Sequence, residues 1–243
     1  MVRKKAASAK KQPIEWRSHE PSRLETFSDA VFAFALTLII VSIEVPKSFD
    51  ELFETLKGTV SFAVCFAALF QIWNSQNVFF RRYGLNDGLT VILNGMLLFV
   101  VLVYVYPMKF LAQLLFTNGT YQQNGQALPM MTNAWQTTTL MLIYGTGYTV
   151  ISVLFYLMYR NAQSKSVHLE LSPKEVFETK TISSINLISA IIGIIAMAMA
   201  LLLPQRISGF SGFTYFLIPF AYTFCFSYRG KKGRMRLDRK SVV

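Results

Sequence analysis

Three polar side chains stand at the start of a long apolar segment, where their presence needs a chemical explanation. Arg23, Ser28 and Asp29 precede the apolar run from Ala30 to Val45. An ionisable group at the centre of a membrane helix costs roughly 2.5–3.5 kcal/mol on insertion scales. Such groups can cap and anchor the helix at the membrane surface, form a buried ion pair that fixes helix assembly, or line a pathway for ions. Local chemistry leaves these three interpretations open.

The spacing of the apolar segment adds a second observation. At about 100° per residue, one stripe of the helix is formed by Phe34, Leu38 and Val41, with Thr37 at its edge. Asp29 and Glu44 lie nearer to the other edge of this face. A helix that faced only lipid would need neither acid, so the pattern favours an interior face.

The sequence Arg23-Leu-Glu-Thr-Phe27-Ser28-Asp29, followed by Ala-Val-Phe-Ala-Phe-Ala-Leu-Thr-Leu, resembles the first helix of the transmembrane protein 175 family. This family comprises the lysosomal potassium channels and their prokaryotic relatives, in which the first helix of each repeat lines the pore. The resemblance implies a potassium-permeable, weakly potassium-selective cation channel without a cofactor. It places the constriction at Phe34, Leu38 and Val41, with Thr37 close by on the pore. Four copies of Glu44 around the same axis would form an acidic ring that also lines the pore, and the alternative is that Glu44 points at water or pairs with Lys47.

The motif occurs once in this chain, as expected for a prokaryotic member with a single repeat. One pore-lining helix encloses nothing, so several copies must surround an axis. The resemblance implies that the assembly is a homotetramer.

Composition indicates an integral membrane protein independently of the resemblance. Hydrophobic residues make up 53% of the 243 residues, and charged residues only 15%. The apolar runs predict an all-α membrane protein with six transmembrane helices, at about 30–45, 56–80, 89–106, 135–159, 181–203 and 210–228. These helices form a channel domain over 23–228, flanked by basic tails at 1–22 and 229–243, of which the first is expected to be disordered.

The distribution of basic residues predicts the orientation of the chain. Of the 24 Lys and Arg residues, 20 fall on one side of the predicted membrane and 4 on the other. The positive-inside rule then places both termini in the cytoplasm, as an even number of spans requires. We expect a multi-pass protein of the cell membrane, the inner membrane of a bacterium, whose tails contact anionic lipid headgroups rather than nucleic acid.

Polar side chains recur at one predicted depth on the first three helices. In hydrocarbon each would be costly alone, so we predict a hydrogen-bonded network that holds the first helix in place. The alternative is a set of separate interfacial residues wetted by headgroup water. The predicted network comprises Arg23, Phe27, Ser28, Asp29, Trp73, Asn74, Gln76, Asn77 and Asn94.

Catalytic and metal-binding motifs are missing from the sequence. It has no Cys-x-x-Cys, no phosphate-binding glycine loop and no His-Glu-x-x-His, and its two histidines, His19 and His168, lie outside the predicted spans. We therefore expect neither an enzyme nor a metal site. The remaining alternatives are a proton-coupled transporter or proton leak pathway using Asp29 and Glu44, and a membrane assembly protein.

One further motif invites a specific interpretation. Tyr144-Gly-Thr-Gly-Tyr148 resembles the Thr-Val-Gly-Tyr-Gly filter of other potassium channels. A filter needs a re-entrant loop, whereas these glycines lie in the middle of a predicted span, where small residues usually permit close helix packing. The position favours packing.

Overall fold

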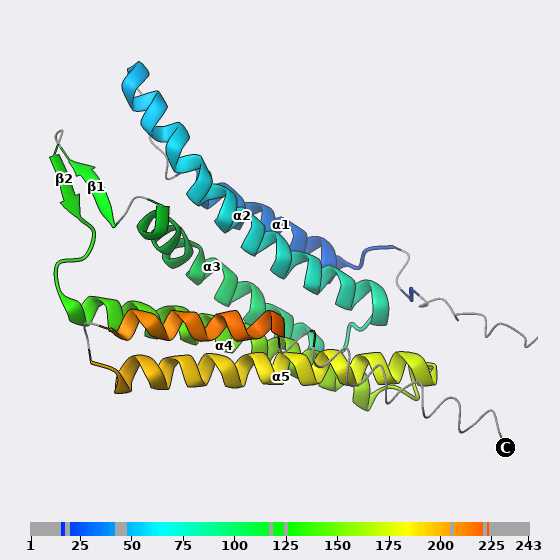
Figure 1. Cartoon of the computed structure of the whole chain (residues 1–243). Coiled ribbons are helices and arrows are strands. Elements are labelled where there is room, and N and C mark those ends of the chain that lie inside the picture. The colour runs from blue at the N-terminus through cyan, green and yellow to red at the C-terminus, as the bar shows by residue number, and fades with distance from the viewer. Residues whose placement is uncertain are drawn as a thin grey trace, which may run out of the picture.

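The computed structural model describes residues 16–17, 20–41, 48–116, 119–123, 126–204, 207–220 and 223. Within these residues the chain forms long helices and one short hairpin (Figure 1). The α-helices are α1 (Arg23–Val41), α2 (Phe49–Tyr83), α3 (Gly88–Phe116), α4 (Ala134–Ser164) and α5 (Pro173–Leu202), and a 3₁₀ helix, η1, spans Ser208–Phe216. The strands are β1 (Thr120–Gln123) and β2 (Gln126–Pro129).

Three of the described helices are suited to cross a bilayer. By length and composition, α3, α4 and α5 contain spans at Gly88–Leu114, Trp135–Ser164 and Pro173–Leu202. The sequence predicts six spans, three more than length and composition identify among the described residues. The sixth predicted span, 210–228, is described only at 210–220 and 223, where η1 continues into a short α-helical stretch at 217–220.

The structure adds two details to the sequence expectations. α3 continues through Pro107 to Phe116, beyond the predicted span at 89–106. The fold is all-α apart from one short antiparallel hairpin, in which Thr120 pairs with Pro129 and Gln123 with Gln126. Neither difference changes the helical architecture.

The helices form two groups joined through α3. α1 packs on α2 and α3, whereas α5 packs on α4 and η1, and α4 also contacts α3. Figure 1 shows α3 between the α1–α2 pair and the α4–α5 pair. One buried core joins α1, α2 and α3, and includes Phe32, Ile39, Leu69 and Val101. A second core joins the ends of α2 and α4 to α3.

The residues just before α1 are part of this fold. The Arg17 backbone N–H donates to the Arg81 carbonyl at 3.1 Å, and the Arg81 guanidinium lies 4.8 Å from the centre of the Trp16 ring. The prediction that the whole 1–22 segment is disordered is therefore wrong for these two residues. Residues 1–15 and 18–19 of the tail lie outside the described residues.

Candidate functional site

The start of α1 is capped by residues that the sequence interpretation overlooked. The Ser22 N–H donates to the Glu25 carboxylate at 3.0 Å, and the Glu25 N–H donates to the Ser22 hydroxyl at 3.2 Å. This reciprocal pair is a capping box, and its Ser-x-x-Glu spacing was readable in the sequence. Ser28 and Asp29 consequently lie in the second turn of α1, so the interpretation of either as the N-terminal cap is wrong.

A chain of buried hydrogen bonds links the first three helices below this cap. The Gln76 amide donates to the Asn94 carbonyl oxygen at 2.9 Å, and the Asn94 amide donates to the Ser28 hydroxyl at 2.8 Å. The Ser28 hydroxyl in turn donates to the Leu24 carbonyl at 2.7 Å. Gln76, Asn94 and Ser28 are each at most 1% exposed, so a missing partner would leave a desolvated polar group. The chain therefore fixes the rotation of α1 against α2 and α3.

A second contact reaches the same turn of α1 from its exposed side. The Trp73 indole N–H donates to the Asp29 carboxylate at 2.7 Å. An indole nitrogen only donates and a carboxylate oxygen accepts, so the two groups are complementary. The two hydrogen-bonded contacts hold Ser28 and Asp29 to different residues of α2 and α3.

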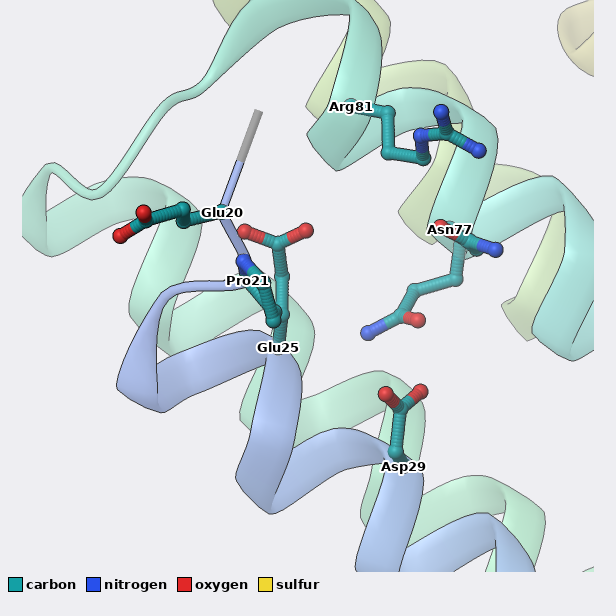
Figure 2. A pocket seen from close by; sticks show the side chains of 7 residues that line it. Glu20, Pro21, Glu25, Asp29, Asn77 and Arg81 are labelled. Carbon is teal, nitrogen blue, oxygen red and sulfur yellow. The ribbon is translucent and has the colours of Figure 1, made fainter. Parts of the chain in front are cut away.

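A cavity of about 260 Å³ opens beside this contact, between the start of α1 and the end of α2. Figure 2 shows the Glu25 and Asp29 carboxylates of α1 facing Asn77 and Arg81 of α2. The cavity lining holds three carboxylates, one guanidinium and two amides, from Glu20, Glu25, Asp29, Arg81, Gln76 and Asn77, together with Pro21. The cavity is therefore polar. Within the described residues, no group of three or more His, Cys, Asp or Glu side chains could hold a metal ion.

Four residues of the predicted network make none of these hydrogen bonds, and one of them, Asn77, lines the cavity. Arg23, Phe27 and Asn74 are exposed, and within the described part of the chain Arg23 and Asn74 make no side-chain hydrogen bond or ion pair. Asn74 is two residues from Gln76, which places it on nearly the opposite side of α2. The position of these residues along their helices predicts their depth in the membrane but not the direction in which each side chain points.

The predicted pore stripe lies partly on the uncovered face of α1. Phe34 is 57% exposed, whereas Phe32 is 3% exposed and packs in the core. Thr37 is also exposed, and its hydroxyl donates to the Ala33 carbonyl at 2.9 Å. Leu38 is half-buried and packs against the core. The uncovered face is therefore centred closer to Thr37 than to Leu38, and Phe34 lies toward one edge of it.

The remaining two predicted pore residues can be placed only in part. Val41 is the last residue of α1, and its side chain lies outside the description, as does the whole of Glu44. The same end of α1 has a partner that the sequence did not suggest. The Lys109 ammonium of α3 donates to the Ile39 carbonyl at 3.3 Å, where a cation complements the negative end of the helix dipole.

The Tyr144-Gly-Thr-Gly-Tyr148 motif lies within the regular helix α4, and its glycines allow close packing. A Cβ added to Gly147 would lie 2.1 Å from the Tyr104 ring of α3. A Cβ added to Gly145 would lie 2.4 Å from Met197 of α5. The packing interpretation of this motif is confirmed.

Comparison with known proteins places this arrangement in a family. The sequence profile of the family described as endosomal/lysosomal potassium channel TMEM175 matches residues 23–104, which span α1, α2 and most of α3. A protein of Marivirga tractuosa named potassium channel is 37% identical over 211 residues, which cover 84% of this chain and 85% of that protein.

Two solved structures resemble the whole fold. A crystal structure of a variant of the potassium channel MtTMEM175, bound to a nanobody–MBP fusion protein, matches with a TM-score of 0.78 and 33% identity over 90% of this chain and 98% of that one. The structure of a lysosomal potassium-selective channel TMEM175 homolog from Chamaesiphon minutus shares the fold, with a TM-score of 0.54 and 20% identity over 84% and 96% of the two chains. The profile, the relative and the shared fold agree, and this chain is a multi-pass membrane protein that belongs to the TMEM175 family.

Proposed function

We propose that this chain is one subunit of a homotetrameric, potassium-permeable cation channel whose pore is lined by four copies of α1. The similarity to proteins named potassium channel supports the permeant ion. The observation that carries the proposal is the asymmetry of α1. One face is fixed by the buried chain from Gln76 through Asn94 to Ser28, while the face with Phe34 and Thr37 is uncovered in the single chain.

The constriction in this proposal is apolar. Four Phe34 side chains that met on an axis would leave no polar group to replace the water of a passing ion, and narrow apolar pores also lose their water. Potassium holds its hydration shell less tightly than sodium, so it passes such a gap at a lower cost. Thr37 hydroxyls one turn away would offer partial hydration between Phe34 and lesser rings formed by Leu38 and Val41.

We also propose that carboxylates at both ends of the pore helix attract cations. Both termini lie in the cytoplasm, so the acidic cavity at Glu25 and Asp29 lies at the inner mouth of the pore. Four Glu44 carboxylates at the outer mouth would raise the local cation concentration and repel anions. The tails contact anionic headgroups of the cell membrane.

A flux experiment with two phenylalanine variants tests this function. Purified protein in liposomes should conduct potassium faster than sodium, with single-channel currents in planar bilayers. Phe34→Ala should raise the cation leak and reduce the discrimination between the two ions, because it removes the exposed ring. Phe32→Ala is the matched control, since Phe32 is buried on another face of α1.

Three other outcomes would argue against this function. If the two phenylalanine variants conducted alike, the pore face would be misplaced. Slow, proton-coupled flux without unitary currents would favour a carrier using Asp29 and Glu44. Absence of any current in a pure bilayer would favour an assembly role.

A further inference from the structure

A single arginine outside α1 joins distant parts of the fold. Arg17 lies six positions before α1, and its backbone is hydrogen-bonded to the last turn of α2 through Arg81. Gly84 follows α2 and lies beside the Arg17 backbone, and its φ of +59° is a backbone conformation that residues with side chains rarely adopt. The segment before α1 is thus held against the end of α2.

The Arg17 side chain continues from there to the connection between α4 and α5. Its Nη1 and Nη2 donate to the two Glu175 carboxylate oxygens at 2.9 and 3.2 Å. Its Nε donates to the Leu169 carbonyl at 2.9 Å, and Nη2 also reaches the Glu170 carbonyl at 3.5 Å. We call Arg17 with Leu169, Glu170 and Glu175 the Arg17 clip. A planar guanidinium can make this set of bonds, whereas a lysine ammonium cannot.

The acceptor side of the clip is itself rigid. Glu175 forms a capping box with Ser172, whose N–H donates to the same carboxylate at 2.9 Å. Side-chain exposure in the ion pair is 16% for Arg17 and 5% for Glu175. Two neighbouring contacts also tie the end of α2 to α5: Arg82 with Glu178, and the Tyr83 hydroxyl with the Thr179 hydroxyl at 2.8 Å. The guanidinium therefore binds a carboxylate whose position is fixed by the start of α5.

The clip crosses between the two helix groups. α1 packs on α2 and α3, whereas α5 packs on α4 and η1. Arg17 and Glu175 are 158 positions apart in sequence and belong to different groups. Any rotation of the α4–α5 pair relative to the start of α1 would have to break a largely buried, two-pronged ion pair and its accompanying bonds to backbone carbonyls. A buried ion pair is weak evidence for stability, and its best-attested use is to specify one arrangement over another.

We propose that Arg17 is a positioning residue that sets the equilibrium between conducting and non-conducting arrangements of the channel. It does so by holding the start of the pore helix to the α4–α5 pair. This inference rests on the proposed channel function. Because Arg17 lies before α1 and bonds to α2 and the α4–α5 connection, it acts on the position of the pore helix rather than on the passing ion.

Single-channel recording from reconstituted protein tests the clip with three variants. Arg17→Ala removes every bond of the guanidinium, and Arg17→Lys keeps the charge but loses the two-pronged geometry. Glu175→Gln removes the partner charge while Gln can still cap α5. All three should shift the open probability in the same direction, by about fivefold or more for Arg17→Ala and less for the other two. Unitary conductance and reversal potential should stay at their wild-type values.

The control is Arg160→Ala, because Arg160 is an exposed arginine near the end of α4 whose guanidinium contacts Tyr156 on the same helix. It should leave the open probability unchanged. An altered reversal potential in Arg17→Ala would overturn the proposal, as would lower thermal stability with an unaltered open probability. Should Arg17→Ala fail to assemble, Arg17→Lys and Glu175→Gln decide the question. Wild-type protein without current would refute the channel function, whereas normal current in all three variants would refute only the clip.

Discussion

The contact of α1 with α2 and α3 and the contacts of α4 both bury small or polar residues, but they use them differently. In the first, Ser28, Gln76 and Asn94 are joined by hydrogen bonds. In the second, Gly145 and Gly147 leave space that side chains of α5 and α3 occupy. The first contact is specified by donor and acceptor identity, and the second by shape.

Polar atoms near the second contact confirm the distinction. Among the described residues, the Thr149 and Tyr215 hydroxyls are buried without a hydrogen-bond partner. A Cβ on Gly193 of α5 would lie 2.3 Å from that Thr149 hydroxyl. Polar atoms near α4 therefore remain without hydrogen-bond partners at positions where the packing leaves no space for an additional carbon atom. The buried hydrogen-bond chain from Gln76 through Asn94 to Ser28 should instead be sensitive to the loss of a hydrogen-bond partner.

The largest expected effect is that of Gly147→Ala. The new methyl group would overlap the Tyr104 ring, which cannot easily move because its hydroxyl donates to the Ile143 carbonyl at 3.0 Å. We expect a loss of about 2–3 kcal/mol in the free energy of unfolding, measured by denaturant titration in mixed micelles. Gly95→Ala on α3 is the control, because its Cβ would meet no heavy atom within 4 Å. It should be neutral or stabilising by up to about 1 kcal/mol.

Equal effects of the two glycine variants would mean that shape does not specify the α3–α4 contact. Gly145→Ala offers a graded comparison. Its Cβ would meet the flexible Met197 side chain, which can move aside. It should therefore cost less than Gly147→Ala.

The next effect is that of Asn94→Leu, which replaces the amide by an apolar group of similar size. It should cost about 1–3 kcal/mol, because Gln76 loses the acceptor of its amide and Ser28 loses a donor while both stay buried. Asn74→Leu is the matched variant, since Asn74 is exposed. Its effect should stay within about 0.5 kcal/mol. A similar loss in both variants would contradict the buried hydrogen-bond chain and favour a general role for interfacial amides.

Sequence reasoning succeeded where the evidence was local or depended on depth. The apolar runs located the helices, and Ser172-Pro-Lys-Glu175 has the capping-box spacing that is found at the start of α5 at Pro173. Ser28, Trp73 and Asn94 were predicted at one depth, and the structure brings them into or beside the same polar layer. Depth follows from the count of residues along a helix, at about 1.5 Å each.

The sequence could not supply contacts that depend on direction or on distant partners. Helical periodicity did not show that Leu38 would be covered by the core while Thr37 stayed exposed, because this depends on where α2 and α3 lie. Arg17 resembled any other residue of a basic tail, since its carboxylate partner is 158 positions away. Such a pair becomes visible only after the helices are assembled.

The smallest expected effect concerns a charged contact between α3 and α4. The Asp87 carboxylate lies 2.7 Å from the Lys165 ammonium and accepts hydrogen bonds from Thr90 at 2.7 Å and Asn161 at 3.2 Å. Burial alone would raise the pKa of Asp87, but the hydrogen bonds and the positive charge of Lys165 outweigh it and hold this pKa well below its usual range. The contact thus depends on ionisation, unlike the neutral polar chain beside α1.

Asp87→Asn should therefore destabilise the protein in a pH-dependent way. A carboxyl whose pKa is lower in the folded state stabilises the fold above its unfolded pKa of about 3.9, and this contribution is lost as the pH falls below that value. The variant should be less stable by up to about 1 kcal/mol at pH 7, by the same amount at pH 5, and by progressively less below pH 4. The measurement is the difference in unfolding free energy between wild type and variant across this range, with Asn94→Leu as the control whose cost should not vary with pH. A constant Asp87→Asn difference down to pH 3 would show that the carboxylate acts at the end of α4 by shape and neutral hydrogen bonding, as the glycines do, rather than by charge.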